Sequence, residues 1–331
     1  MYWRIEVNSN VKKLLKHNQE LLIVFLLVVI TGLIYFLSNN HYFLATNQRA
    51  LLDFFYLPVL LGAYFFGKKH ATYSAFLSVL MVFSMAYFVE NNFLNKNFTN
   101  SILSKWTEIT TWGCFLILTG YTMGTLYERK ETYYKELGST YQGIVTMLSL
   151  LIDSVDKYTQ NHSYRVSKYA EQIAKDIGLT NLEIEDIRIA ALLHDLGKIG
   201  VSVEILNKIG PLTSDEKKEM SSHTQKASDL LEPVQGRVLK ILPLIVNHHE
   251  KYDGNGYNTL VGDSIPIGAK IIAIADVYDA LTTDRPYRKA LSPLEGKKEI
   301  VRGAGTDFDP EVVKHFEHIF PKLNVEEPLI N

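Results

Sequence analysis

Four long apolar segments in the first third of the chain constrain the fold more than any other feature. They are residues 21–37, 50–66, 71–89 and 109–127. Asp53 is the only charged residue in them, and each has 17 to 19 residues, within the range that a helix needs to cross a hydrocarbon layer of about 30 Å. Without regularly spaced polar positions, such helices would have no side suited to water. The pattern predicts four transmembrane helices within residues 1–127.

Basic residues around these segments predict an orientation. They cluster before the first segment, between the second and third, and after the fourth, at Arg4, Lys12, Lys13, Lys16, Lys68, Lys69, Arg129, Lys130 and Lys135. By the positive-inside rule, both termini are expected in the cytoplasm. No small-residue cleavage site follows the first segment, so we expect it to remain as an anchor.

Imidazoles and carboxylates concentrate further along the chain, between residues 192 and 290. Four of the ten histidines lie there. Asp195 and Asp276 each follow an apolar stretch, where a carboxylate is costly to bury unless it is paired or bound to a metal. The sole cysteine, Cys114, lies in the fourth apolar segment, so no thiolate contributes. Such a donor set suits Mn, Fe, Co or Zn in a catalytic centre.

Two adjacent pairs, His194 with Asp195 and His248 with His249, indicate a centre for two ions. A carboxylate can bridge two ions, and the second pair can give one ligand to each. Ions about 3.5–4 Å apart activate a water and stabilise the leaving oxygen of a phosphoryl displacement. Lys198, one helical turn past His194, is placed to contact a phosphate oxygen. Each histidine taken alone is as readily a buried core residue.

These residues resemble the HD-GYP family, a branch of the HD phosphohydrolases. The resemblance lies in His194 with Asp195, residues 248–257 and residues 275–288, and it covers roughly residues 140–316. It implies an all-helical domain that hydrolyses the bacterial second messenger cyclic di-GMP to linear pGpG, and in some members on to GMP. The metal ligands that it implies are His162, His194, Asp195, His223, His248, His249 and Asp276.

The resemblance also implies roles for the other site residues. Asp195 and Lys198 would be catalytic, with Lys198 on the scissile phosphate. Arg285, Arg288 and Tyr257 would bind the nucleotide. Hydrolysis would use a water activated by the ions, without a covalent enzyme intermediate.

Two positions depart from the family pattern. Asn258 stands where the family has proline, which predicts a less rigid loop after Tyr257. Tyr158 stands where members with a third metal have glutamate, which favours two divalent ions, with Fe or Mn as the first candidates. Glu250 either orients a metal ligand or is a surface acid.

The predicted fold class is all-α, with a four-helix transmembrane region (1–127), a helical linker (128–139) and a cytoplasmic HD-type domain (140–331). Thr180 and Glu183 predict a capping box at the start of the helix that ends at His194 and Asp195. Thr213 and Glu216 predict another at the start of the helix that bears His223. Ser292 and Asp309 each precede proline at a helix start. An apolar stripe from Leu137 to Val155 predicts a homodimer seam, or packing against the domain.

The expected location is the bacterial inner membrane, with several spans and both termini cytoplasmic. The expected partners are cyclic di-GMP and membrane lipid, with a second copy of the chain and a diguanylate cyclase as further candidates. A net charge of −2 offers no footprint for duplex nucleic acid. Two alternatives stay open: an HD hydrolase of another nucleotide, and a receptor that binds the nucleotide or a cyclase with little turnover. Asn258 leaves room for the receptor, whereas seven ligand positions favour an enzyme.

Overall fold

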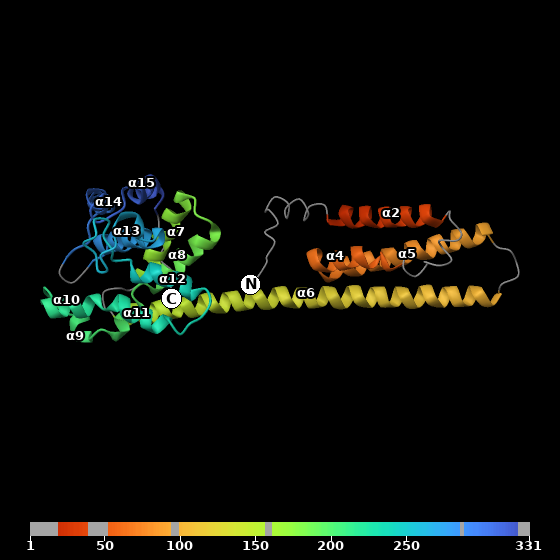
Figure 1. The fold of residues 1–331 in the computed structure, drawn as a ribbon, viewed down its shortest axis with the longest axis horizontal. Coiled ribbons are helices and arrows are strands. Elements are labelled where there is room, and N and C mark those ends of the chain that lie inside the picture. Colours follow the sequence, from red (N-terminus) through yellow and green to blue (C-terminus); the bar gives the residue numbers. More distant parts are fainter. Residues whose placement is uncertain (1–18, 39–51, 94–98, 156–160, 285–287, 324–331) are drawn as a thin grey trace. The chain divides into compact units, whose positions relative to one another are not determined.

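The computed structural model describes residues 19–38, 52–93, 99–155, 161–284 and 288–323 (Figure 1). These residues form helices and no β-strand, so the predicted all-α class is confirmed. The chain divides into two compact units, Met1–Gly138 and Ser139–Asn331. We describe each unit by itself.

The first unit contains α2 (Gln19–Ser38), α4 (Tyr56–Phe66), α5 (Lys68–Phe93) and the start of α6 (Thr99–Val155). Its core is apolar, with Leu27, Phe55 and Leu116 fully buried. Many other large apolar side chains of this unit are exposed, among them Phe25, Tyr73 and Phe115. The unit therefore presents an apolar exterior as well as an apolar core.

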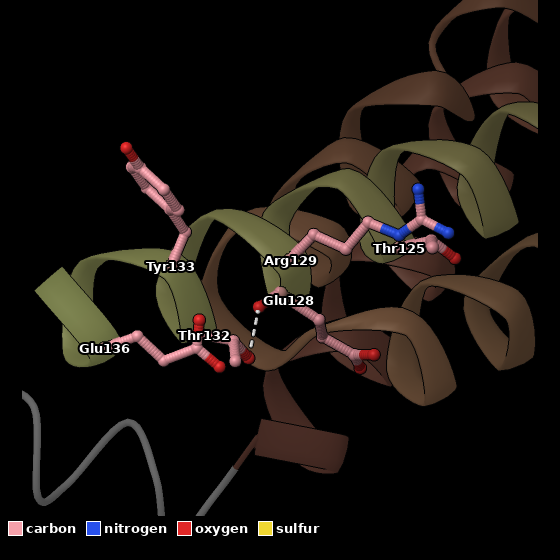
Figure 2. Close-up of a pocket in the computed structure, with 6 residues that line it drawn as sticks. All are labelled: Thr125, Glu128, Arg129, Thr132, Tyr133 and Glu136. Carbon is pink, nitrogen blue, oxygen red and sulfur yellow. Dashed lines mark hydrogen bonds between the residues drawn. The ribbon is translucent and has the colours of Figure 1, made fainter.

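Glu128 connects two helices of the first unit. Its Oε1 accepts a hydrogen bond of 2.8 Å from the backbone N–H of Lys68, in the first turn of α5. An acidic side chain is favourable at that end of a helix. Figure 2 shows Glu128 beside Arg129 and Thr132 on α6, where they line a shallow hollow of about 340 Å³. The Thr132 hydroxyl donates to the Glu128 carbonyl at 3.0 Å.

The structure does not reproduce the prediction of four membrane spans. Within the described residues, only the stretch Lys68–Tyr87 is long and apolar enough to cross a membrane. Segment 50–66 is broken by a turn at Phe54 and Phe55, so α4 has 11 residues. Segment 109–127 lies inside α6, where recurring threonines and glycines lower its hydropathy.

The second unit is built from the end of α6 and short helices packed around one apolar core. The elements are α7 (His162–Ile177), α8 (Asn181–Leu193), η1 (Leu196–Gly200), α9 (Val203–Leu206), α10 (Ser214–Ser221), α11 (His223–Leu231), α12 (Val238–Val246), η2 (Gly262–Ser264), α13 (Ile267–Thr282), α14 (Pro293–Arg302), α15 (Pro310–Ile319) and η3 (Phe320–Lys322). Helix α13 is continuously buried over its first half, from Gly268 to Ala275, because its residues there are almost all apolar. Figure 1 shows α7, α8 and α13 close together.

The predicted helix starts agree with the structure, and two details differ. Capping boxes are present at Thr180, Thr213 and Ser292. The helix that begins after Thr213 ends at Ser221, and a new helix, α11, begins at His223. Helix α8 ends at Leu193, so His194 and Asp195 lie in the turn before η1 rather than on the helix.

Candidate metal centre

Five separate segments of the second unit bring the predicted metal ligands together. They come from the start of α7, the turn after α8, the start of α11, the residues after α12, and α13. Their ligand atoms form two groups, each within 4.8 Å: Asp195, His223, His248 and His249 in one, and His162, His194 and Asp276 in the other. All seven predicted ligands therefore belong to one of two neighbouring clusters.

Asp195 faces both clusters with different oxygens. Its Oδ1 lies 3.7 Å from His223 Nε2. Its Oδ2 lies 3.4 Å from His194 Nε2 and 4.0 Å from His162 Nε2. The two oxygens of this carboxylate therefore lie toward different clusters.

Three of the imidazoles are oriented by their own backbone. The Nδ1–H groups of His194, His223 and His248 donate to the carbonyls three residues earlier, at 2.7, 2.7 and 2.6 Å. A ring that donates through Nδ1 keeps the lone pair of Nε2 for a metal. In all three rings Nε2 is buried and has no hydrogen-bond partner within the described residues. Such atoms are costly to bury without a partner, and divalent ions would satisfy them.

The pKa values of three imidazoles suit ligands at neutral pH. Burial lowers the pKa of His223, strongly lowers that of His248, and lowers that of His249 to about 4. These rings are therefore neutral at pH 7 and can bind a metal without first losing a proton.

His162 is the exception among the imidazoles. Its Nδ1 lies 2.7 Å from Asp279 Oδ2, and its Nε2 lies 3.2 Å from Asp276 Oδ1. Burial alone would lower its pKa, but the hydrogen bonds to Asp276 and Asp279 raise it to about 10. Without a metal, this ring carries a proton on each nitrogen.

The two carboxylates are held ionised by their surroundings. Burial would raise the pKa of Asp195, but the Lys198 ammonium, 2.7 Å away, and the nearby imidazoles hold it well below its usual value. Burial likewise opposes ionisation of Asp276, and its hydrogen bond with His162 lowers its pKa despite that. Both groups are ready to coordinate cations.

Sequence reasoning assigned no role to Asp279 and Arg165. Asp279 contacts the predicted ligand His162, and Arg165 contacts Asp279. Arg165 donates to both oxygens of Asp279, from Nε at 2.6 Å and from a terminal nitrogen at 2.9 Å. Asp279 in turn fixes the ring of His162. A signal was present, because Asp279 lies three residues after Asp276 on a buried helix and so shares its face.

The predicted substrate residues lie around an open pocket of about 810 Å³. Its wall includes Lys198, Tyr257 and Arg288, together with the ligands His162, Asp195 and His249. Lys198 stands on η1, three residues from Asp195, rather than on the same helix as His194. Arg288 donates to the carbonyl of Ala280, which holds it at the wall. Arg285 and Tyr158 lie outside the described residues.

Glu250 has neither of the two predicted roles. It is buried, so it is not a surface acid, and its carboxylate accepts hydrogen bonds from the backbone of Asn258 and Leu260 rather than from a metal ligand. Asn258 also makes side-chain hydrogen bonds. The expected loosening of this loop is therefore opposed by hydrogen bonds that proline could not make.

Comparisons with known proteins place these features in a family context. The family model described as HD domain matches residues 146–312. The chain is 36% identical over 191 residues to the cyclic di-GMP phosphodiesterase response regulator RpfG of Xanthomonas campestris, covering 57% of this chain and 50% of that protein. It is 34% identical over 196 residues to 3'3'-cGAMP-specific phosphodiesterase 2 of Vibrio cholerae, covering 59% of this chain and 37% of that protein.

A third relative is a cyclic di-GMP phosphodiesterase of Thermotoga maritima. It is 33% identical over 193 residues, covering 58% of this chain and 52% of that protein. The chain thus spans about half the length, or less, of these curated relatives. The family match itself covers half of the chain and contains both ligand clusters. The chain belongs to the HD domain family.

Proposed function

We propose that the chain is a metal-dependent phosphodiesterase of the HD-GYP branch, which hydrolyses cyclic di-GMP to linear pGpG. The observation that carries this proposal is the pair of ligand clusters at the wall of an 810 Å³ pocket, with the two oxygens of Asp195 near one histidine of each. Three buried Nε2 atoms without a partner in the described residues favour metal binding over a structural role for the histidines. The names of several relatives support the substrate.

Two divalent ions, when bound, would supply the Lewis acidity that makes a water acidic and neutralises charge on the phosphate. We propose Fe or Mn, because the donor set has imidazoles and carboxylates but no thiolate. The ligands of one ion would be His162, His194 and Asp276, those of the other His223, His248 and His249, with Asp195 between them.

The remaining residues would bind and orient the substrate. The Lys198 ammonium lies 2.7 Å from Asp195 Oδ2 and lines the pocket, so its positive charge would attract a non-bridging phosphate oxygen. Arg288 adds a fixed positive charge at the wall. The ring of Tyr257, 4.8 Å from the ring of His249, offers a surface on which a base can stack.

The test is product formation by the full chain in detergent, loaded anaerobically with Fe(II) or Mn(II). We expect release of pGpG, measured by chromatography, with GMP as a further product to be scored. Asp195→Ala should remove turnover and lower the bound metal while the protein remains folded. Undiminished turnover in Asp195→Ala would overturn the role of this carboxylate.

A second candidate substrate is 3'3'-cGAMP, another cyclic dinucleotide. Three of the similar relatives are named as phosphodiesterases specific for it. The same preparation should therefore be assayed with both substrates at equal concentration. A larger kcat/KM for 3'3'-cGAMP would replace the first proposal, and binding without turnover of either would favour the receptor.

We also propose that the first unit anchors the chain in the bacterial inner membrane, with both termini cytoplasmic. Four apolar segments and exposed side chains such as Phe25, Phe76 and Leu118 support this location. Cys114, the sole cysteine, provides a test. A membrane-impermeant maleimide should label it in detergent but not in intact vesicles or spheroplasts. Equal labelling in both would exclude a position in the bilayer.

A homodimer through α6 is a further proposal. Within the second unit, Leu148 and Ile152 of the stripe pack against the core, while Ile144 and Leu151 are exposed. Part of the predicted stripe thus packs on the domain, and the other part is available to a second copy. Sedimentation of Ile144→Asp should show a smaller species than the unsubstituted chain.

A further inference from the structure

One buried carboxylate holds the loop that carries Tyr257. Glu250 is 4% exposed. Its Oε1 accepts a hydrogen bond of 2.6 Å from the backbone N–H of Asn258, and its Oε2 accepts one of 2.9 Å from that of Leu260. Both oxygens of the side chain are used, as a buried carboxylate requires.

Thr259 lies between these two N–H groups in a strained conformation. Its φ is 61°, in the left-handed region, which a β-branched residue rarely adopts. Such strain persists only where the surrounding contacts enforce it. The two hydrogen bonds to Glu250 hold the backbone on both sides of Thr259.

The side chain of Asn258 ties the same loop to the end of α12. Its Nδ2 donates to the carbonyl of Val246 at 3.2 Å and to Oδ1 of Asn247 at 3.3 Å. His248 and His249 follow immediately. Proline has neither a backbone N–H nor a side-chain donor, so none of these three hydrogen bonds could form with the family residue.

The loop also lies directly on the backbone of the histidine pair. A Cβ at Gly256 would come within 2.5 Å of Glu250 Cα and 2.9 Å of the His249 carbonyl oxygen, so only glycine fits. The next residue, Tyr257, places its ring 4.8 Å from the ring of His249 and lines the pocket. A small shift of this loop would therefore move Tyr257 relative to the ligand clusters.

We propose that Asn258 and Glu250 are positioning residues, which fix Tyr257 at the pocket wall and thereby set the affinity for the substrate rather than the rate of the chemical step. In this chain the loop is held by three hydrogen bonds of Asn258 that proline could not make. The inference rests on the proposed hydrolysis of a cyclic dinucleotide.

The experiment compares Asn258→Ala and Asn258→Pro with the unsubstituted full chain. Asn258→Ala loses the two side-chain hydrogen bonds, and Asn258→Pro loses all three. We expect KM for cyclic di-GMP to rise about tenfold, the lower end of what removal of a supporting group costs at such sites. The value of kcat and the metal content should stay within about twofold, because Asn258 touches no metal ligand through its side chain.

Asn255→Ala is the matched control. Asn255 lies in the same loop, but it donates only to Asp253, two residues earlier. Its substitution should leave KM unchanged. A small chromogenic diester, bis(p-nitrophenyl) phosphate, provides a second control, since it needs the metal centre but no stacked purine. Its hydrolysis should be equal in all of these variants.

Thr259→Gly separates positioning from folding. Glycine adopts a positive φ without strain, so this variant should melt at the same temperature as the unsubstituted chain or higher. The freed loop should nevertheless raise KM. If the loop had only a structural role, KM would rise only in variants whose melting temperature falls. An unchanged KM in Thr259→Gly would therefore contradict the proposal.

Hydrogen exchange tests the positioning independently of turnover. The peptide covering residues 253–261 should exchange more slowly in the unsubstituted chain than in Asn258→Pro or Glu250→Gln. If the unsubstituted chain hydrolyses no cyclic dinucleotide but shows this protection, the proposed function fails while the positioning of the loop stands. Equal exchange in all variants, or an unchanged KM in Asn258→Pro, would overturn the positioning role.

Discussion

Asp279 accepts a hydrogen bond from His162 Nδ1 across 2.7 Å, and this contact turns the other nitrogen of the ring toward Asp276. The two residues are 117 positions apart in the chain. Because Arg165 holds both oxygens of Asp279, the carboxylate cannot rotate freely. The direction in which His162 presents Nε2 is therefore set by a residue that is not among the predicted ligands.

Asp279→Asn should weaken metal binding without removing a ligand. Asparagine keeps the shape but removes the charge that orients and polarises the imidazole, and such partners are worth about 10–100-fold in metal affinity. Titration of the metal-free protein with Mn(II) measures the change. Asp307→Asn, at an exposed acid, serves as the control, and equal affinity in the two variants would contradict the orienting role.

Metal loading should release a proton from His162. Its pKa is raised to about 10 in the metal-free protein, so the ring must lose a proton before Nε2 can bind an ion. The affinity should therefore rise between pH 6.5 and 9. Calorimetry in buffers of different ionisation enthalpy measures the proton released, and His162→Gln should abolish that release.

The same pKa shift predicts how the stability of the metal-free protein depends on pH. His162 gains its partners in the folded state, and its pKa there is above the unfolded value of about 6.5. The stabilisation is fully present below pH 6.5 and is lost as the pH rises toward 10. Thermal unfolding of the metal-free chain across this range should show a falling midpoint, and His162→Gln should show a smaller fall.

The buried pair of Lys270 and Asp309 should contribute strongly to stability. The two charges are 2.7 Å apart, and both side chains are buried. Asp309→Asn keeps a helix cap but leaves the buried ammonium with the fully exposed Asp263, 3.4 Å away, and the ring of Tyr252, so we expect a loss of about 3 kcal/mol. Denaturant unfolding measures it. Asp307→Asn, from the exposed pair with Lys251, should cost less than about 1 kcal/mol.

This pair also has a predictable pH dependence. Burial would raise the pKa of Asp309, but the hydrogen bond from Lys270 lowers it below its usual value. The stabilisation is therefore present above the unfolded pKa and is lost as the pH falls through the folded one. Asp309→Asn should remove this acid-sensitive part of the unfolding free energy.

Gly197 should tolerate no side chain. A Cβ there would overlap the carbonyl oxygen of His223 and come within 2.6 Å of Ala227 N, so η1 and α11 would have to separate. Gly197→Ala should cost about 1–3 kcal/mol and impair metal binding, because Asp195 immediately precedes η1 and His223 begins α11. Gly143→Ala is the control. Among the described residues outside its own helical turn, none comes within 4 Å of a Cβ added at Gly143 on α6, so stability should rise by up to about 1 kcal/mol.

The sequence anticipated the local features of the second unit well. Capping boxes such as that of Thr180 depend on residues three apart, and the structure contains them. The types of the candidate ligands could also be predicted, because a carboxylate after a buried stretch, as at Asp276, needs a counter-charge or a metal ion. The turn at His194 was missed because the apolar pattern of α8 runs to its end without a signal for where the helix stops.

Contacts between residues far apart in the chain could not be predicted from the sequence. No local pattern around Glu250 predicts that its carboxylate accepts hydrogen bonds from the backbone N–H groups of Asn258 and Leu260. The pairing of Arg165 with Asp279 spans 114 positions. In the first unit the error was a different one. The apolar composition of residues 50–66 predicted one continuous helix, but the structure has a turn at Phe54 and Phe55.

The anchoring of His194, His223 and His248 to carbonyls within their own turns has a consequence for how the protein obtains its cofactor. Each ring takes its direction from a neighbouring peptide group rather than from the cation, so an empty centre keeps its shape. We therefore expect that ions can bind to, and leave, the folded protein without refolding. The identity of the bound element would follow the supply of transition metals in the cell at that moment.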